Sequence, residues 1–188
     1  MTEEAAIRPA RIRTILVLSL LVVGLGVIVV LGILPFFTRP VTTVILVRHA
    51  EKVIDPNNND VDLSTAGQAR AQELVRVLAG AGINAIYATQ YKRTQQTAKP
   101  LADKLGLPVT QINSRSTADL ITQIRTQHRG QTVFVVGHNN TVPEIIYALG
   151  GPQYPAIPET EFDNLFIVTV YRTGKAKVVK LKYGAVTK

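Results

Sequence analysis

The chain has 188 residues, which allows one domain of ordinary size together with an additional segment. It contains no cysteine, so disulfide bonds, thiolate catalysis and cysteine-based zinc sites are excluded. The 21 Lys and Arg residues outnumber the 13 Asp and Glu residues, and the formal charge of +8 favours anionic partners. No basic run is interleaved with aromatic residues, so we predict no nucleic-acid partner.

The first predicted element is an apolar helix near the N-terminus. Residues 15–37 carry no charge and are numerous enough to cross a hydrocarbon core of about 30 Å. Arg8, Arg11 and Arg13 precede this segment and only Arg39 follows it closely, so the positive-inside rule places the N-terminus in the cytoplasm. We therefore predict a cytoplasmic tail at 1–14, a signal anchor at 15–37, a linker at 38–42 and an exported domain at 43–188.

A cleaved secretory signal is the alternative interpretation of the same segment. The apolar run is longer than the usual signal core of about 7 to 15 residues, and it ends in PFFTRP without a small-x-small cleavage site. These features favour a single-pass membrane protein whose domain is extracytoplasmic. Secretion after cleavage remains the second possibility, and both interpretations export the domain.

The remaining sequence alternates apolar runs of strand length with stretches of helical period. This alternation predicts an α/β fold, a three-layer αβα sandwich with a mostly parallel central sheet. The polar run at 55–60 has turn chemistry and predicts a loop. Predicted strands are 43–47, 85–88, 109–112, 132–136, 165–171 and about 176–182, the last two forming a hairpin, and predicted helices are 65–79, 91–105, 116–127 and 142–149.

Two of the three histidines directly follow strongly apolar strands. His49 ends the run TTVILVRH and His138 ends TVFVVGH. Ligands in open α/β sheets bind beyond the carboxyl ends of strands, so both side chains are expected at the same rim. Arg48 adjoins His49, and Arg93 begins a helix after another strand. Guanidinium groups match phosphate oxygens in charge and geometry, so this arrangement favours a phosphate site.

The tetrapeptide Arg48-His49-Ala50-Glu51 after an apolar strand resembles the RHG or RHA signature of the histidine phosphatase superfamily, the phosphoglycerate-mutase-like proteins. Three further segments agree in order and spacing, and they are Leu63 to Gly67 with Arg70-Ala71, Tyr87 to Thr89 with Arg93-Thr94 and Thr97-Ala98, and Val136 to Asn139. The resemblance covers about 44–150 and points to the small phosphatase branch.

The resemblance implies a phosphoric monoester hydrolase that needs no metal or cofactor and acts on a small phosphorylated substrate. His49 would be the nucleophile that forms a phosphohistidine, and Arg48, Arg93 and His138 would hold the phosphate together with it. The general acid is not identified by a motif. Asp119, at the start of a helix, and Glu51, close to His49, are the candidates.

Three alternative functions stay open. The interval between Arg93 and His138 is short, whereas mutases of the family carry a longer insertion there, so a mutase is disfavoured. Small members without the insertion include protein phosphohistidine phosphatases, although export disfavours that function. A non-catalytic module that only binds phosphorylated ligands is the third alternative, supported by the uncertain general acid.

Overall fold

The computed structural model describes residues 4–38 and 41–187, and the chain divides into two compact units, Met1–Arg39 and Pro40–Lys188. The first unit is one helix, α1 (Glu4–Thr38). Its stretch Arg13–Gly32 has a mean hydropathy of 3.1 and no buried residue. This helix is long and apolar enough to span a membrane, a property that signal sequences share.

The second unit is built on one six-stranded sheet in the order β3-β2-β4-β1-β5-β6. Strands β3, β2, β4 and β1 are parallel, while β5 runs antiparallel to β1 and β6 antiparallel to β5. The strands are β1 (Thr42–Arg48), β2 (Ile83–Thr89), β3 (Val109–Ile112), β4 (Thr132–Gly137), β5 (Asn164–Val170) and β6 (Ala176–Lys182). The expected mostly parallel sheet is thus confirmed.

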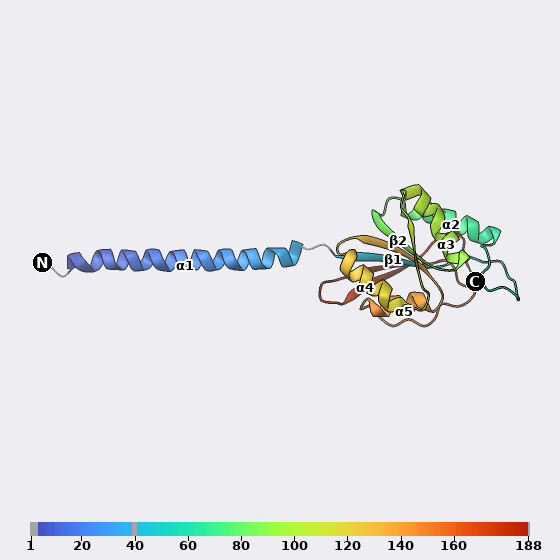
Figure 1. The fold of residues 1–188 in the computed structure, drawn as a ribbon. Coiled ribbons are helices and arrows are strands. Elements are labelled where there is room, and N and C mark those ends of the chain that lie inside the picture. Colours follow the sequence, from blue (N-terminus) through green and yellow to red (C-terminus); the bar gives the residue numbers. More distant parts are fainter. Residues whose placement is uncertain (1–3, 39–40, 188) are drawn as a thin grey trace. The chain divides into compact units, whose positions relative to one another are not determined.

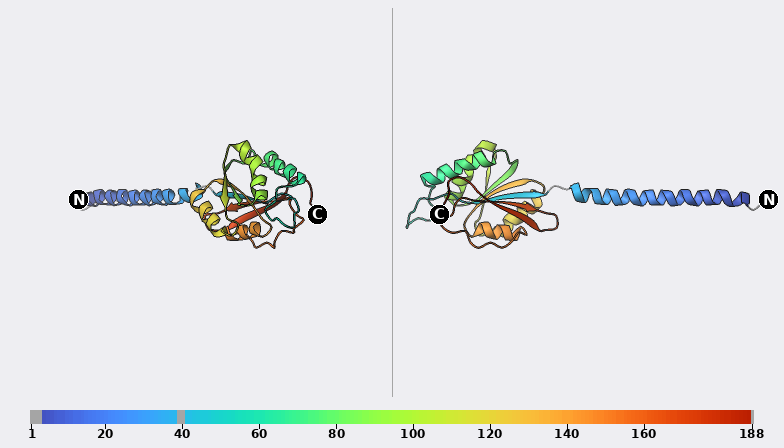
Figure 2. Two further views of the ribbon diagram at one scale, coloured as in Figure 1. Left: turned by 45° about the vertical axis from the view of Figure 1, so that its right-hand side comes forward. Right: turned by 180° about the vertical axis from the view of Figure 1, so that it is seen from behind.

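Helices cover both faces of this sheet, as Figures 1 and 2 show. Helices α2 (Thr65–Leu78) and α3 (Lys92–Leu105) pack on one face, and α4 (Thr117–Gln127) and α5 (Thr141–Ala148) pack on the other. Each face has its own apolar core, because the central strands carry buried side chains on both sides. The three-layer αβα architecture predicted from the sequence is therefore confirmed.

The helix ends follow local chemistry. Ser64 caps α2 by accepting a hydrogen bond from the Gly67 amide, and α3 ends at Gly106, which has a φ of 65°. The C-cap of α2 is Ala79, which has right-handed helical conformation, and a left-handed residue follows at Gly82. The bend after α2 therefore lies in the loop rather than at the helix cap.

The register of the central strands places the two histidines side by side. Arg48 of β1 pairs with Gly137 of β4, and the His49 amide donates to the Gly137 carbonyl at 2.9 Å. His49 and His138 consequently leave adjacent parallel strands at the same carboxyl edge. Thr89 ends β2, the neighbour of β4 on its other side, so three strand ends meet at one place.

Candidate active site

A cavity of about 340 Å³ opens at the carboxyl ends of the parallel strands. All four predicted phosphate-binding residues line it: Arg48, His49, Arg93 and His138. The polar run at 55–60 also reaches the cavity, through Asn59. The other lining residues are Lys52, Tyr91, Ser114, Arg115, Asn139, Asn140, Thr141 and Glu159.

His49 is buried and held in one tautomer. Its Nδ1 lies 2.8 Å from the Ala50 carbonyl, and because a carbonyl only accepts, Nδ1 carries the proton. The lone pair is therefore on Nε2. Burial lowers the pKa of His49 to about 3, and the charges of Arg48 and Arg93 act in the same direction. The ring is a neutral imidazole at physiological pH, which is the form a nucleophile requires.

A chain of hydroxyl groups orients His138. Its Nε2 lies 2.8 Å from Thr89 Oγ1, which lies 2.9 Å from Thr94 Oγ1, and Thr94 also faces the carbonyls of Thr89 and Tyr91. Since Thr94 must donate to a carbonyl, Thr89 can donate to Thr94 and accept from His138 Nε2. Burial lowers the pKa of His138 to about 4, so the ring is neutral in the free site.

The Arg48 guanidinium is fixed by the segment that precedes β5. It lies 4.3 Å above the Phe162 ring, and its Nη1 donates to the carbonyls of Pro158, Glu159 and Glu161 at 2.7 to 3.1 Å. Its Nη2 forms an ion pair with the Glu159 carboxylate. Arg48 is thus aligned by aromatic stacking and by the main chain, at 2% exposure.

Arg93 is held in a similar way, by an aromatic ring and a main-chain carbonyl. Its guanidinium lies 4.4 Å above the Tyr91 ring, and its Nη1 donates to the Asn59 carbonyl at 2.6 Å. The Tyr91 ring in turn contacts His138 edge to face, with ring centroids 5.3 Å apart. Tyr91 therefore supports two of the predicted phosphate ligands at once.

Both arginines keep a buried donor without a partner. The Nε atoms of Arg48 and Arg93 have no hydrogen-bond partner in the part of the chain that the structure describes. A buried unpaired donor costs about 1–3 kcal/mol, so such atoms are expected where a ligand binds. Two guanidinium donors and a neutral imidazole line one cavity, and the ring centroids of His49 and His138 are 5.5 Å apart. Such a set of groups suits a tetrahedral oxyanion.

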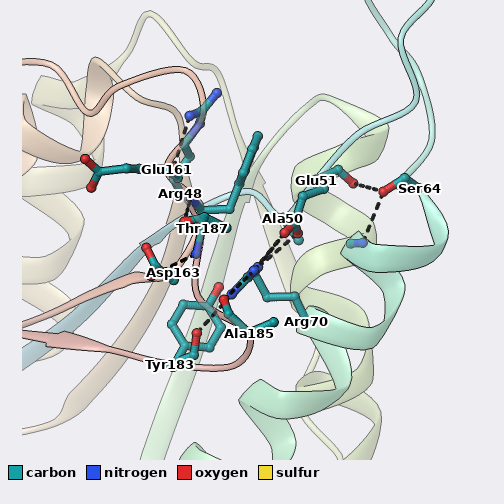
Figure 3. A network of polar contacts seen from close by, with 12 residues as sticks. Arg48, Ala50, Glu51, Ser64, Arg70, Glu161, Asp163, Tyr183, Ala185 and Thr187 are labelled. Carbon is teal, nitrogen blue, oxygen red and sulfur yellow. Dashed lines mark hydrogen bonds and ion pairs between the residues drawn. The ribbon is translucent and has the colours of Figure 1, made fainter.

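Glu51, one of the two candidate acids, belongs to a different network, shown in Figure 3. Arg70 donates to both Glu51 carboxylate oxygens at 2.7 to 3.0 Å, and to the carbonyls of Tyr183 and Ala185. The Glu51 carbonyl accepts from the Ser64 amide at 2.9 Å. This network connects the strand end that carries His49 to α2 and to the C-terminal segment, and Glu51 is not among the lining residues.

The structure does not bring Asp119 to the cavity either. It lies exposed in the first turn of α4 and is absent from the lining. The carboxylate that does line the cavity is Glu159, whose Oε1 also accepts from the Asn139 side chain at 2.7 Å. No motif in the sequence marks Glu159, because the segment around it has neither strand nor helix periodicity. Among the described residues, no cluster of three metal-binding side chains occurs.

In this α/β domain, two arginines and two histidines converge on one cavity at the carboxyl edge of the parallel strands. The model of the histidine phosphatase superfamily (branch 1) matches residues 44–114, the part that carries Arg48, His49 and Arg93. The resemblance seen in the sequence is confirmed: the chain has the histidine phosphatase fold. No curated protein is significantly similar to the chain in sequence.

Solved structures share this fold over most of the chain. The protein histidine phosphatase SixA in complex with tungstate is 19% identical and covers 74% of this chain and 96% of its own, with a TM-score of 0.60. A putative α-ribazole-5'-P phosphatase from Escherichia coli is 15% identical, with 75% and 96% covered and a TM-score of 0.59. The mycobacterial glucosyl-3-phosphoglycerate phosphatase is 13% identical, with 78% and 100% covered and a TM-score of 0.59.

Proposed function

We propose that the protein is a phosphomonoester hydrolase that works through a phosphohistidine on His49. The observation that carries this proposal is the neutral, oriented imidazole of His49 in one cavity with two guanidinium groups whose Nε donors have no partner among the described residues. Structures with the same fold include a phosphohistidine phosphatase bound to tungstate and phosphatases of small phosphate esters, which supports the proposal.

In the first step, His49 Nε2 attacks phosphorus, the nitrogen–phosphorus bond forms and the bond to the leaving oxygen breaks. Arg48 and Arg93 neutralise charge on the equatorial oxygens, where electrostatic stabilisation is the largest contribution to phosphoryl transfer. His138, whose Nε2 is held by Thr89, takes up a proton when the phosphate dianion binds and then donates from Nδ1. Water attacks the phosphohistidine in the second step and releases inorganic phosphate.

The leaving oxygen needs a proton, and we assign this role to Glu159. It is the carboxylate that lines the cavity within the described residues, and the Asn139 side chain holds it there. A phosphate dianion at Arg48 would take the place of the Glu159 carboxylate on the guanidinium and leave Glu159 free to act on the leaving oxygen. In the second step the same carboxylate accepts the proton of the attacking water.

Protein phosphohistidine is the second candidate substrate, favoured by the likeness to SixA, whose structure is that of a protein histidine phosphatase. The cavity is open and polar, so it does not exclude a protein side chain. A phospho-ligand-binding module without turnover is the third candidate. The Nδ1 contact of His49 leaves the lone pair on Nε2, in a cavity that two arginines also line, and this favours chemistry over binding alone.

We also propose that α1 tethers the domain to the cell membrane, with the domain on the extracytoplasmic side. The support is the apolar stretch Arg13–Gly32 and the arginines that precede it. Attachment to a membrane and export would restrict the enzyme to substrates outside the cytoplasm.

The test of catalysis uses the full-length chain in a neutral detergent without added metal. Hydrolysis of 4-nitrophenyl phosphate is expected between about pH 5 and 8, and His49→Ala is expected to lower kcat by at least about 10³ because no nucleophile remains. Lys104→Gln, at the far end of α3, is the control. Trapping of a ³²P-labelled, acid-labile protein adduct in the wild type would identify the intermediate. A folded wild type that binds vanadate but shows no turnover would contradict the proposal.

A further inference from the structure

The cavity carries more positive charge than a single phosphate group uses. Arg48 and Arg93 form an inner pair that is almost fully buried, next to His49. Lys52 and Arg115 line the same cavity but are more exposed, so they form an outer pair nearer to solvent. Within the described residues the lining contains one carboxylate.

The backbone around each residue of the outer pair is anchored to a neighbouring segment. Lys52 forms an isolated β-bridge with Leu63, which ties it to the segment before α2. The turn that carries Arg115 is attached to the end of β2, because Gln90 accepts from the Ser114 amide at 2.8 Å and donates to the Ser114 hydroxyl at 3.2 Å. Both cations therefore extend from anchored backbone beside the cavity.

Neither side chain of the outer pair is neutralised by the protein. In the region covered by the structure, Lys52 and Arg115 form no ion pair and no side-chain hydrogen bond, whereas Lys99 and Lys182 pair with nearby carboxylates. A single solvated cation would contribute little to the binding of an anion. Two such cations at the mouth of a phosphate site raise the local concentration of anionic ligands.

A phosphate dianion would balance the inner pair, and Glu159, as the proposed acid, is protonated when it acts on the leaving oxygen. The two positive charges of the outer pair would then remain at the mouth, on the side from which the leaving group must project. We propose that the substrate is a phosphomonoester whose leaving group carries a second anionic group, a carboxylate or a phosphate, bound by Lys52 and Arg115. This proposal rests on the proposed phosphatase function and specifies its substrate class.

Three matched substrates test the proposal on the full-length chain in neutral detergent. They are 4-carbamoylphenyl phosphate, whose amide is neutral, 4-carboxyphenyl phosphate, which carries a carboxylate, and 1,4-phenylene bisphosphate, which carries a phosphate. The readout is the ratio of kcat/KM for each charged substrate to that for the amide, in the wild type, Lys52→Gln, Arg115→Gln and the double variant. Lys104→Gln, which removes an exposed cation far along α3, controls for net charge.

We expect each single substitution to lower this ratio about tenfold, because one charge-assisted contact is lost, and Lys104→Gln to leave it unchanged. A larger drop for the carboxylate or for the bisphosphate identifies which anion the site takes. A ratio that is the same in the wild type and the double variant overturns the proposal.

A binding experiment separates this proposal from the proposed catalysis. Calorimetric titration with 4-carboxybenzylphosphonate and 4-carbamoylbenzylphosphonate, which cannot be hydrolysed, reports the same preference without turnover. If no substrate is hydrolysed but the carboxylate phosphonate binds about tenfold more tightly and loses this advantage in the double variant, the second-anion site stands and the catalytic function fails. Equal binding of the two phosphonates overturns the second-anion site.

Discussion

His49 and Arg48 show how adjacent residues at one strand end receive different roles. The His49 side chain is held by a local contact, the neighbouring carbonyl of Ala50. Arg48 instead depends on residues more than 100 positions away, at Pro158, Glu159 and Glu161. The proposed nucleophile is therefore oriented by a local contact, whereas the orientation of Arg48, a proposed phosphate ligand, requires the segment before β5.

The general acid can be identified by comparing leaving groups. In Glu159→Gln we expect hydrolysis of glycerol 3-phosphate to fall by about 10² to 10⁴, because an alkoxide leaves poorly without a proton, and hydrolysis of 4-nitrophenyl phosphate to fall much less. Steady-state kinetics of both substrates measure the difference. Asp119→Asn and Glu51→Gln are the matched variants. If either of them selectively lost hydrolysis of glycerol 3-phosphate, that residue rather than Glu159 would be the general acid.

At the scale of elements, the start of α2 supports the strand end that carries His49. The Glu51 carbonyl accepts from the Ser64 amide, and a Cβ at Gly67 would collide with this same carbonyl. Arg70, one turn further along α2, holds the Glu51 carboxylate. The glycine is thus required by close packing between the helix and the loop after β1, at a position where its φ is not left-handed.

Gly67→Ala tests this contact. We expect it to lower the free energy of unfolding by about 1–3 kcal/mol through overpacking, and to lower kcat/KM by displacing the residues after His49. Chemical denaturation and kinetics of the full-length chain measure the two effects. Gly80→Ala is the control, since a Cβ at Gly80 meets nothing within 4 Å. Equal free energies of unfolding for the two variants would show that the loop after β1 shifts to accept the added methyl group without loss of stability.

At the scale of the whole molecule, the buried histidines link stability to pH. The pKa values of His49 and His138 are lowered to about 3 and 4, against about 6.5 in the unfolded chain. Below pH 6.5 the unfolded state therefore binds more protons than the folded state. The stability contributed by the neutral rings is fully present above pH 6.5 and is lost as the pH falls towards 4 and 3.

We therefore expect the melting temperature to fall from pH 7 to pH 4.5, more steeply in the wild type than in His138→Gln, which removes one of the two groups. Circular dichroism of the full-length chain in detergent measures both curves. The control is His128→Gln, which changes the histidine that lies outside the cavity. Parallel curves for wild type and His138→Gln would contradict a neutral buried His138.

The topology of the whole chain gives the last prediction. A reporter that is active only outside the cytoplasm, fused after Lys188, is expected to be active, because on the proposed topology Arg8, Arg11 and Arg13 would keep the N-terminus inside. Sedimentation of the intact fusion with alkali-washed membranes would indicate an uncleaved anchor, and release of a shorter product would indicate a cleaved signal. Activity of a reporter that works only in the cytoplasm would contradict export.

The sequence by itself determined the layered fold and the four residues that meet at the cavity, namely Arg48, His49, Arg93 and His138. The apolar strand runs fix which residues follow each strand, and the parallel sheet brings His49, Arg93 and His138 to one edge. Strand and helix bounds agree within a few residues for the same reason, because local periodicity sets them.

Only the tertiary structure decided which carboxylate reaches the site and what holds the arginines. Glu159 and Phe162 lie in a segment without periodicity, and they reach the cavity because β5 pairs antiparallel with β1 and folds that segment over Arg48. Glu51, close to His49 in sequence, is instead turned to Arg70 and the C-terminal segment. Contacts of such high sequence separation depend on packing in three dimensions, which local patterns do not encode.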